Sequence, residues 1–165
     1  MDENNIPISK NGFEKLKKEL DDLKRERPEV IQAIKEAREE GDLRENAGYE
    51  AARERQSMLE ARISHLESRL PKCNVIDISE MEGEKVVFGA TVEIEDLDSG
   101  EVKRYTLLGP DEADFKQGTI SVYSPLAQGL LNKEVGDVAE IDAPKGRIDY
   151  EIISIQFNSQ EENSQ

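Results

Sequence analysis

Residues 34–52, IKEAREEGDLRENAGYEAA, join two helical patterns through a short polar turn and decide the fold of the N-terminal half. Each pattern places apolar residues three, four or seven apart, which is the spacing of a helix that buries one heptad seam. The first seam contains Phe13, Leu16, Leu20, Leu23, Val30, Ile34 and Ala37, and the second contains Ala52, Leu59, Ile63, Leu66 and Leu70. Because so few residues separate the seams, the two helices are expected to fold back antiparallel. At about 1.5 Å per residue, roughly 29 residues make an arm about 40 Å long.

Four residues mark the ends and irregularities of this hairpin. Ser9 is placed to cap the first helix, and Pro71 ends the second. Arg27 interrupts the first seam at a position where an apolar residue is expected. Pro28 removes one backbone hydrogen bond and is predicted to kink or restart the helix.

From Val86 onward the hydrophobic period changes from helical spacing to alternation, which predicts strands. The expected strands are 86–94, 101–108, 118–122, 137–142 and 147–156, with a short helix that begins at Ser124-Pro125. The predicted fold class is α+β: an antiparallel helical hairpin followed by a small, mainly antiparallel sheet with one short helix. The predicted domains are 1–73 (hairpin), 74–84 (linker), 85–157 (sheet domain) and 158–165 (disordered tail).

The charge is uneven along the chain. Residues 1–73 carry a net charge of −2, and residues 74–165 carry −13. Since phosphate contacts require Lys and Arg, the acidic second half is a poor candidate for direct nucleic-acid binding and a better one for docking on a basic protein surface. The acidity could also serve solubility alone. A polar, acidic N-terminus, a single cysteine and the lack of a long apolar run favour the cytoplasm.

The sequence contains no phosphate-binding loop, dinucleotide-binding glycine motif or metal-ligand cluster. His65 and Cys73 stand alone, and neither has the paired base or acid that a nucleophilic site needs. We therefore expect no self-contained enzyme.

The turn around Gly41 has two interpretations. In the structural one, Gly41 ends the first helix in a left-handed conformation, Asp42 caps the second helix and Glu45 completes a capping box. In the functional one, the carboxylates form part of a metal site, because Mg²⁺ prefers oxygen ligands. The acids Glu39 and Glu40 weaken the structural interpretation, since the helix dipole disfavours negative charge in a last turn. Two carboxylates hold Mg²⁺ only weakly, but they can complete a site that another protein half-builds.

The residues around this turn resemble the hairpin tip of the bacterial Gre transcript cleavage factors. The tip resemblance covers residues 36–47, Tyr49 and residues 51–54. It continues over nearly the whole chain, through residues 75–77, 88–92, 111–115 and 124–127. Gly48 and Tyr123 depart from the residues often found in the family.

This resemblance implies a function. In the family, the hairpin enters the secondary channel of bacterial RNA polymerase when the enzyme has slid backward and its RNA 3′ end occupies that channel. The tip acids help to hold a second Mg²⁺, and the polymerase's own active site hydrolyses the RNA. The second domain resembles FK506-binding proteins (FKBP-like) in fold, without isomerase activity, and docks on the rim of the channel.

Residue roles follow where this sequence matches the family. The resemblance makes Asp42 and Glu45 the catalytic, metal-holding acids, Arg53 a contact to the RNA 3′ segment that Arg55 extends, and Ser124 and Pro125 the rim-docking loop. We expect a monomer with no cofactor of its own and no membrane association, which shares Mg²⁺ with the polymerase and has the polymerase and the nascent RNA 3′ end as partners.

Three alternatives remain at this point. The first is a channel binder that blocks rather than stimulates cleavage, although the Asp42 and Glu45 pattern is intact. The second is an unrelated coiled-coil scaffold, which the internally satisfied seam disfavours. The third is a peptidyl-prolyl isomerase, which needs an apolar, aromatic-lined pocket that the few aromatic residues of the second domain would have to supply.

Overall fold

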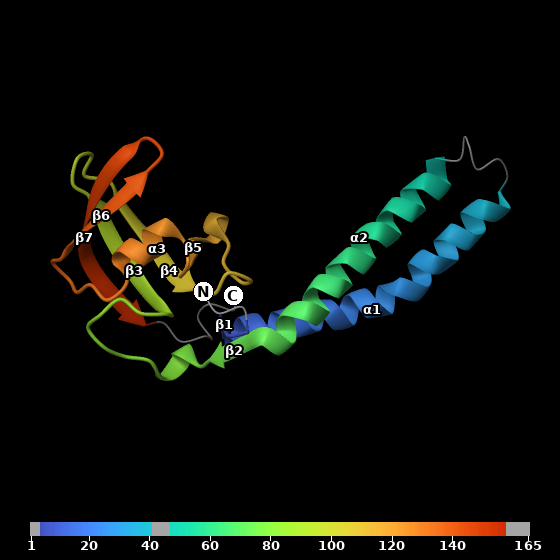
Figure 1. The fold of residues 1–165 in the computed structure, drawn as a ribbon, viewed down its shortest axis with the longest axis horizontal. Helices are drawn as coiled ribbons and strands as arrows, with labels where there is room; N and C mark the ends of the chain where they lie inside the picture. The colour runs from blue at the N-terminus through green and yellow to red at the C-terminus, as the bar shows by residue number, and fades with distance from the viewer. Residues whose placement is uncertain (1–3, 41–46, 158–165) are drawn as a thin grey trace. The chain divides into compact units, whose positions relative to one another are not determined.

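The N-terminal helices form a hairpin. A computed structural model describes residues 4–40 and 47–157. Helix α1 (Lys10–Glu39) and helix α2 (Ala47–Arg69) run antiparallel (Figure 1), and a short 3-10 turn, η1 (Leu70–Lys72), follows α2. Pro28 lies inside α1, which continues through it as one helix, so the alternative that the helix restarts there is wrong.

The predicted seam is the buried face of this hairpin. The buried apolar residues of the two helices are Leu16, Val30, Ile34, Ala37, Leu59, Ile63 and Leu66, and all seven belong to the predicted seams. Leu20, Leu23 and Ala52 pack partly buried against them. Burial of each large aliphatic side chain contributes about 1.5–3 kcal/mol, so this single stripe holds the two helices together.

Ion pairs across the hairpin explain the polar interruption of the seam. The Arg27 guanidinium donates from Nε to Glu60 Oε1 at 2.7 Å and from Nη2 to Glu60 Oε2 at 2.9 Å. Arg62 makes the same bidentate contact with Glu19, from Nε to Oε2 at 2.7 Å and from Nη2 to Oε1 at 2.9 Å. These side chains are partly exposed, and ion pairs that reach solvent stabilise little. Their fixed geometry favours one register of α1 against α2.

The remaining residues form a second compact unit, which contains the chain up to Phe13 and from Cys73 onward, whereas Glu14–Lys72 make up the hairpin unit. Strand β1 (Ile6–Ser9) pairs in parallel with β2 (Cys73–Ile76), so the two helices form the crossover connection that parallel strands require. The segment expected to be a linker thus carries β2 and a 3-10 turn, η2 (Ile78–Glu80).

A five-stranded sheet forms most of this globular unit, in the order β5-β4-β3-β7-β6. The strands are β3 (Ala90–Asp96), β4 (Val102–Leu108), β5 (Thr119–Ser121), β6 (Val138–Ala143) and β7 (Gly146–Phe157). Neighbouring strands are antiparallel except β4 and β5, which are parallel. The predicted α+β architecture is confirmed, and the FKBP-like comparison stays a prediction.

The first predicted strand begins four residues late. Val86 is fully buried, as the alternation predicts, but its backbone N–H donates to the Lys133 carbonyl oxygen rather than to a strand. Gly89 then turns the chain with φ of 88°, a conformation that glycine adopts without steric cost. The strand therefore starts at Ala90, because alternation reports burial and not backbone pairing.

The core of the globular unit lies between the sheet and helix α3 (Pro125–Leu130), with the 3-10 turn η3 (Phe115–Gln117) at its edge. Its fully buried residues include Val92, Ile94, Leu107, Leu130 and Ile152. The aromatic side chains Tyr105 and Tyr150 are buried, and Phe88, Tyr123 and Phe157 pack against the same core. Aromatic surface is therefore used for packing, which gives no support to an aromatic-lined isomerase pocket.

Candidate functional site

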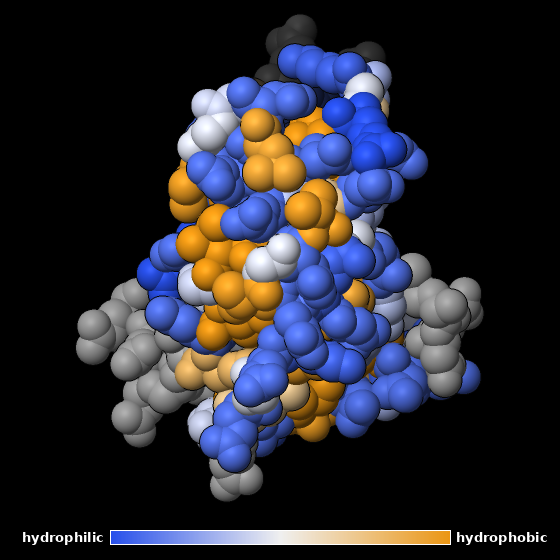
Figure 2. Space-filling view, turned by 90° about the vertical axis from the view of Figure 1, so that its left-hand side faces the viewer, coloured by the Kyte–Doolittle hydropathy of each residue, from blue (hydrophilic) through white to orange (hydrophobic). Residues whose placement is uncertain are grey.

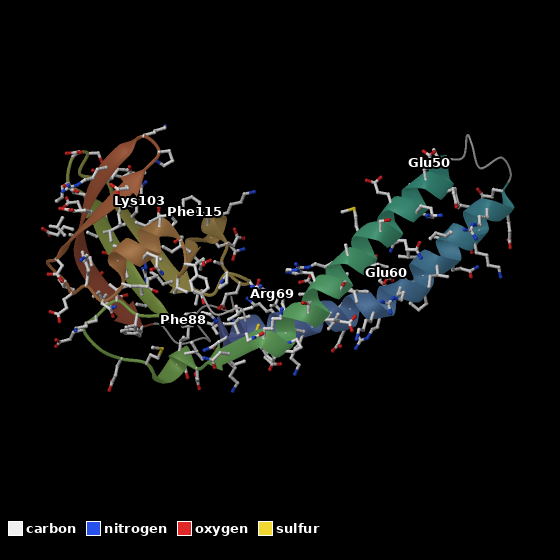
Figure 3. The ribbon with its side chains drawn as sticks, in the orientation of Figure 1. Glu50, Glu60, Arg69, Phe88, Lys103 and Phe115 are labelled. Carbon is white, nitrogen blue, oxygen red and sulfur yellow. The ribbon has the colours of Figure 1, made fainter. Side chains whose placement is uncertain are left out.

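The turn acids Asp42 and Glu45 lie outside the described residues, so their cap and metal roles remain predictions. The described ends of the two helices frame the turn. Glu39 is exposed in the last turn of α1, and Glu50 lies in the first turn of α2. Figure 3 shows Glu50 at this end of α2, with Glu60 farther along and Arg69 at the opposite end.

A cluster of two arginines around one tyrosine links the helices directly behind the turn. Arg53 Nη1 donates to Tyr49 Oη at 3.0 Å, and Arg38 Nη2 lies 3.5 Å from the same oxygen. Both guanidiniums also lie over the Tyr49 ring, with their central carbons 5.6 Å (Arg38) and 5.9 Å (Arg53) from the ring centroid. Cation–π attraction and hydrogen bonding therefore hold a residue of α1 and a residue of α2 on one phenol.

This cluster changes the acidity of Tyr49. Hydrogen bonds from Arg38 first and from Arg53 second lower the pKa of the phenol below its ordinary value. The cause is that both cations favour the negatively charged tyrosinate. The two guanidinium groups therefore give this end of the hairpin a local positive charge.

An open groove of about 410 Å³ lies beside the cluster. It is lined by Ile31, Ile34, Lys35, Arg38, Glu39, Arg53 and Gln56, which include three cations and one acid. Within the described parts of the chain, neither Arg38 nor Arg53 forms an ion pair with a carboxylate. Such a surface can accept an anionic group such as a phosphate, to which guanidinium donates charge-assisted hydrogen bonds.

Arg55, the second predicted RNA contact, has a different environment. Its Nε and Nη2 atoms lie 3.1 and 2.5 Å from Glu26 Oε1, across the hairpin. Arg55 is therefore tied to a carboxylate of α1, whereas Arg53, two residues earlier, faces the groove. The structure thus brings Arg53 together with Arg38, Lys35 and Tyr49. Sequence reasoning gave no role to these last three, although the helical spacing of Tyr49 and Arg53 places them on one face.

The predicted docking loop is well ordered by its own hydrogen bonds. Ser124 caps α3, since its Oγ accepts the Ala127 N–H at 3.3 Å and donates to the Ser121 carbonyl oxygen at 2.7 Å. Pro125 follows it at the first position of the helix and is exposed. The cap is thus confirmed, and the docking role remains a prediction that the exposed proline allows.

The surface of the globular unit is mixed. Figure 2 shows one face on which hydrophobic side chains gather between hydrophilic ones. Phe115 in η3 (Figure 3) is 69% exposed. Its ring stacks on that of Tyr105, with the ring centroids 5.8 Å apart. Together with the acidity of this half of the chain, exposed apolar residues are compatible with a protein-docking surface.

The described residues hold no ready metal centre. In residues 4–40 and 47–157, no three side chains of the types His, Cys, Asp or Glu lie close enough together to hold a metal ion. Over the same residues, no helix is both long and apolar enough to span a membrane.

The described structure thus belongs to the class of proteins that combine an antiparallel helical hairpin, here with a cationic groove, and a separate unit built on a five-stranded sheet. The family description "Transcription elongation factor, N-terminal" matches residues 6–75, and "Transcription elongation factor, GreA/GreB, C-term" matches residues 81–157. The chain belongs to the GreA/GreB family of transcription elongation factors.

Two proteins named transcription elongation factor GreA agree with this assignment. The chain is 70% identical over 152 residues to the transcription elongation factor GreA of Nitratidesulfovibrio vulgaris (strain Miyazaki F), covering 92% of this chain and 95% of that protein. It is 52% identical over 156 residues to GreA of Methylococcus capsulatus, covering 93% and 99%. Among solved structures, the GreA factor homolog 1 protein of Thermus thermophilus is 32% identical with a TM-score of 0.43, covering 92% of this chain and 99% of that one.

Proposed function

We propose that this chain binds bacterial RNA polymerase, inserts its hairpin into the secondary channel and stimulates the polymerase's own hydrolysis of backtracked RNA. The proposal rests on membership of the transcription elongation factor family together with one observation. Among the described residues, the two arginines of the Arg38–Tyr49–Arg53 cluster have no carboxylate partner, and they lie close in sequence to the turn residues Asp42 and Glu45. A phosphate backbone lying along this end of the hairpin would meet cations first and carboxylates at the turn.

The proposed role of each residue follows from its charge. Arg53 and Arg38 would hold the RNA 3′ segment through its phosphates. Asp42 and Glu45 would supply carboxylate oxygens, the ligand type that Mg²⁺ prefers. An ion held jointly with the polymerase would supply the activation of water for phosphodiester hydrolysis. Ser124 and Pro125 would contact the rim of the channel, and the acidic globular unit favours a basic docking surface.

The proposal makes the chain a stimulating factor and not a nuclease, because its own carboxylates are too few to hold a metal without the polymerase. It would act as a monomer.

The test uses the full chain and backtracked elongation complexes of a bacterial polymerase, with the nascent RNA labelled at its 5′ end and, in a parallel sample, near its 3′ end. Addition of the protein should release short 3′ fragments and restore elongation. Complexes that remain uncleaved while the protein is bound would refute cleavage stimulation and favour a channel blocker.

A further inference from the structure

One carboxylate of the globular unit holds the end of β1, where α1 begins; both segments belong to that same unit. Glu112 lies between β4 and η3, 103 residues from its main partner, Ser9. Its Oε2 accepts the backbone N–H of Ser9 at 2.8 Å and that of Gly109 at 2.9 Å, and its Oε1 accepts the Ser9 hydroxyl. Glu112 thus receives three donors from two segments that are distant in sequence.

Two glycines let the segments around Ser9 and Glu112 approach each other closely. The Gly12 N–H donates to Ser9 Oγ at 3.0 Å, which makes Ser9 both the cap of α1 and a partner of Glu112. A side chain at Gly12 would collide with the Glu112 carboxyl group, and one at Gly109 would collide with the Pro7 carbonyl oxygen. Ser9 is only 4% exposed, so water competes little for these hydrogen bonds.

The proposed function assigns no role to Glu112. Its hydrogen bonds nevertheless hold the junction between β1 and α1, where a small change in angle moves the far end of the helix. Ser9 is the last residue of β1, and α1 begins at the next residue. A helix of 30 residues is about 45 Å long, so a tilt of ~5° at its first turn displaces its far end by about 4 Å. In catalysis, a misplacement of about 1 Å can already cost about 100-fold in rate.

We propose that Glu112 is a positioning residue, which anchors the first turn of α1 to the loop after β4 and thereby sets where the hairpin turn is delivered. This inference rests on the proposed function, because delivery matters only if the turn acts in the polymerase. The anchor itself is a property of the free protein and can be measured without polymerase.

The first experiment measures the anchor. Spin labels are placed on cysteines introduced at the exposed positions Ser57 and Lys145, with Cys73 replaced by Ser in every sample, and the distance distribution is recorded by pulsed electron resonance. Glu112→Gln keeps the size of the side chain but replaces one acceptor oxygen by a donor, so the distribution should widen. Ser9→Ala removes the other partner and should widen it too.

Glu101→Gln is the matched control, because Glu101 is exposed, lies in the same unit and undergoes the same change of charge. It should leave the distribution unchanged. An unchanged distribution in both Glu112→Gln and Ser9→Ala would overturn the anchor.

The second experiment separates positioning from docking and folding. At a temperature where circular dichroism shows full folding, Glu112→Gln should lower the maximal cleavage rate at saturating factor by about 10- to 100-fold. Its affinity for polymerase, measured by competition with labelled wild type, should change less than about twofold. A wider distance distribution with an unchanged cleavage rate would overturn the positioning role. If wild type itself stimulates no cleavage, the proposed function fails, while the distance measurement still decides the anchor.

Discussion

At the scale of single residues, the charges of the hairpin are used in two ways. Arg27, Arg55 and Arg62 are tied to carboxylates on the opposite helix, and these contacts serve the hairpin itself. Arg38 and Arg53 instead share a phenol and line an open groove. Among the described residues, arginine is therefore paired with a carboxylate in one part of the hairpin and not in another.

The turn acids allow the sharpest test at this scale. Asp42→Asn and Glu45→Gln should both fold with an unchanged melting temperature, because Asn caps helices as well as Asp and Gln also fits a capping box. Both variants should bind polymerase and compete with wild type, yet stimulated cleavage should fall by about 10²–10³, since the charges that hold the metal are lost. Near-normal stimulation of cleavage by Asp42→Asn would show that the turn has only a structural role.

Arg53 and Arg55 form a matched pair for the RNA contact. Arg53→Ala should strongly reduce crosslinking from the RNA 3′ end to the protein, because Arg53 lines the groove. Arg55→Ala should reduce it little, since Arg55 is held by Glu26 on α1. Both variants lose one positive charge, so equal effects would indicate that only net charge matters and that the groove has no specific role.

The Tyr49 phenol reports on the cluster through its acidity. The difference between wild type and Tyr49→Phe in a spectrophotometric titration at 295 nm should give a midpoint below the ordinary tyrosine value of about 10. Arg53→Ala should raise that midpoint. Because the pKa is lowered in the folded protein, the tyrosinate stabilises the fold above the unfolded pKa, and this contribution is lost as the pH falls through the folded pKa. A midpoint at or above 10 would contradict the hydrogen bonds from Arg38 and Arg53 to the Tyr49 phenol.

At the scale of elements, the hairpin depends on one narrow seam. Most of its surface is exposed, so each buried side chain carries a large share of the contact between α1 and α2. The Arg–Glu pairs define the register, while the aliphatic seam supplies most of the stabilisation. The globular unit has a broader core, in which strands from all parts of the sheet and α3 contribute.

This difference predicts how the hairpin responds to truncation of its core. Ile63 is 1% exposed, so Ile63→Ala should lower the free energy of unfolding of the hairpin by about 2–5 kcal/mol. Met58 on the same helix is 68% exposed, and Met58→Ala should change it by less than about 0.5 kcal/mol. Urea denaturation followed by circular dichroism at 222 nm measures both. A similar loss for the two variants would mean that the seam is not the stabilising contact.

At the scale of the whole molecule, the proposed function assigns the chemistry to a complex with polymerase and not to the free chain. Purified protein without polymerase should cleave no RNA at any Mg²⁺ concentration, because two carboxylates do not form a fixed cage for the ion. Isothermal titration of Mg²⁺ should show no binding tighter than about 1 mM. RNA cleavage by the free protein, lost in Asp42→Asn, would show that the chain is itself a nuclease.

The sequence alone determined the hairpin. Heptad spacing on both sides of a short turn leaves the antiparallel arrangement as the one way to bury both seams. It also indicated the α+β class, the Ser9 and Ser124 caps and the approximate strands, since these depend on local periodicity and local hydrogen bonds. The family was visible in the tip motif. Asp42 and Glu45 could be named from sequence, and their geometry lies outside the described residues.

Only the tertiary structure decided which charged residues are engaged. Arg27 interrupted a seam in the sequence, and the fold supplies Glu60 as its partner from the opposite helix. Arg53 and its extension Arg55 were both predicted RNA contacts, and the packing of α1 against α2 gives them different partners. Ser9 was a helix cap in the sequence, and its contact with Glu112 bridges 103 positions. The physical reason is common to all three cases: a side chain's partner across the fold has no fixed spacing along the chain.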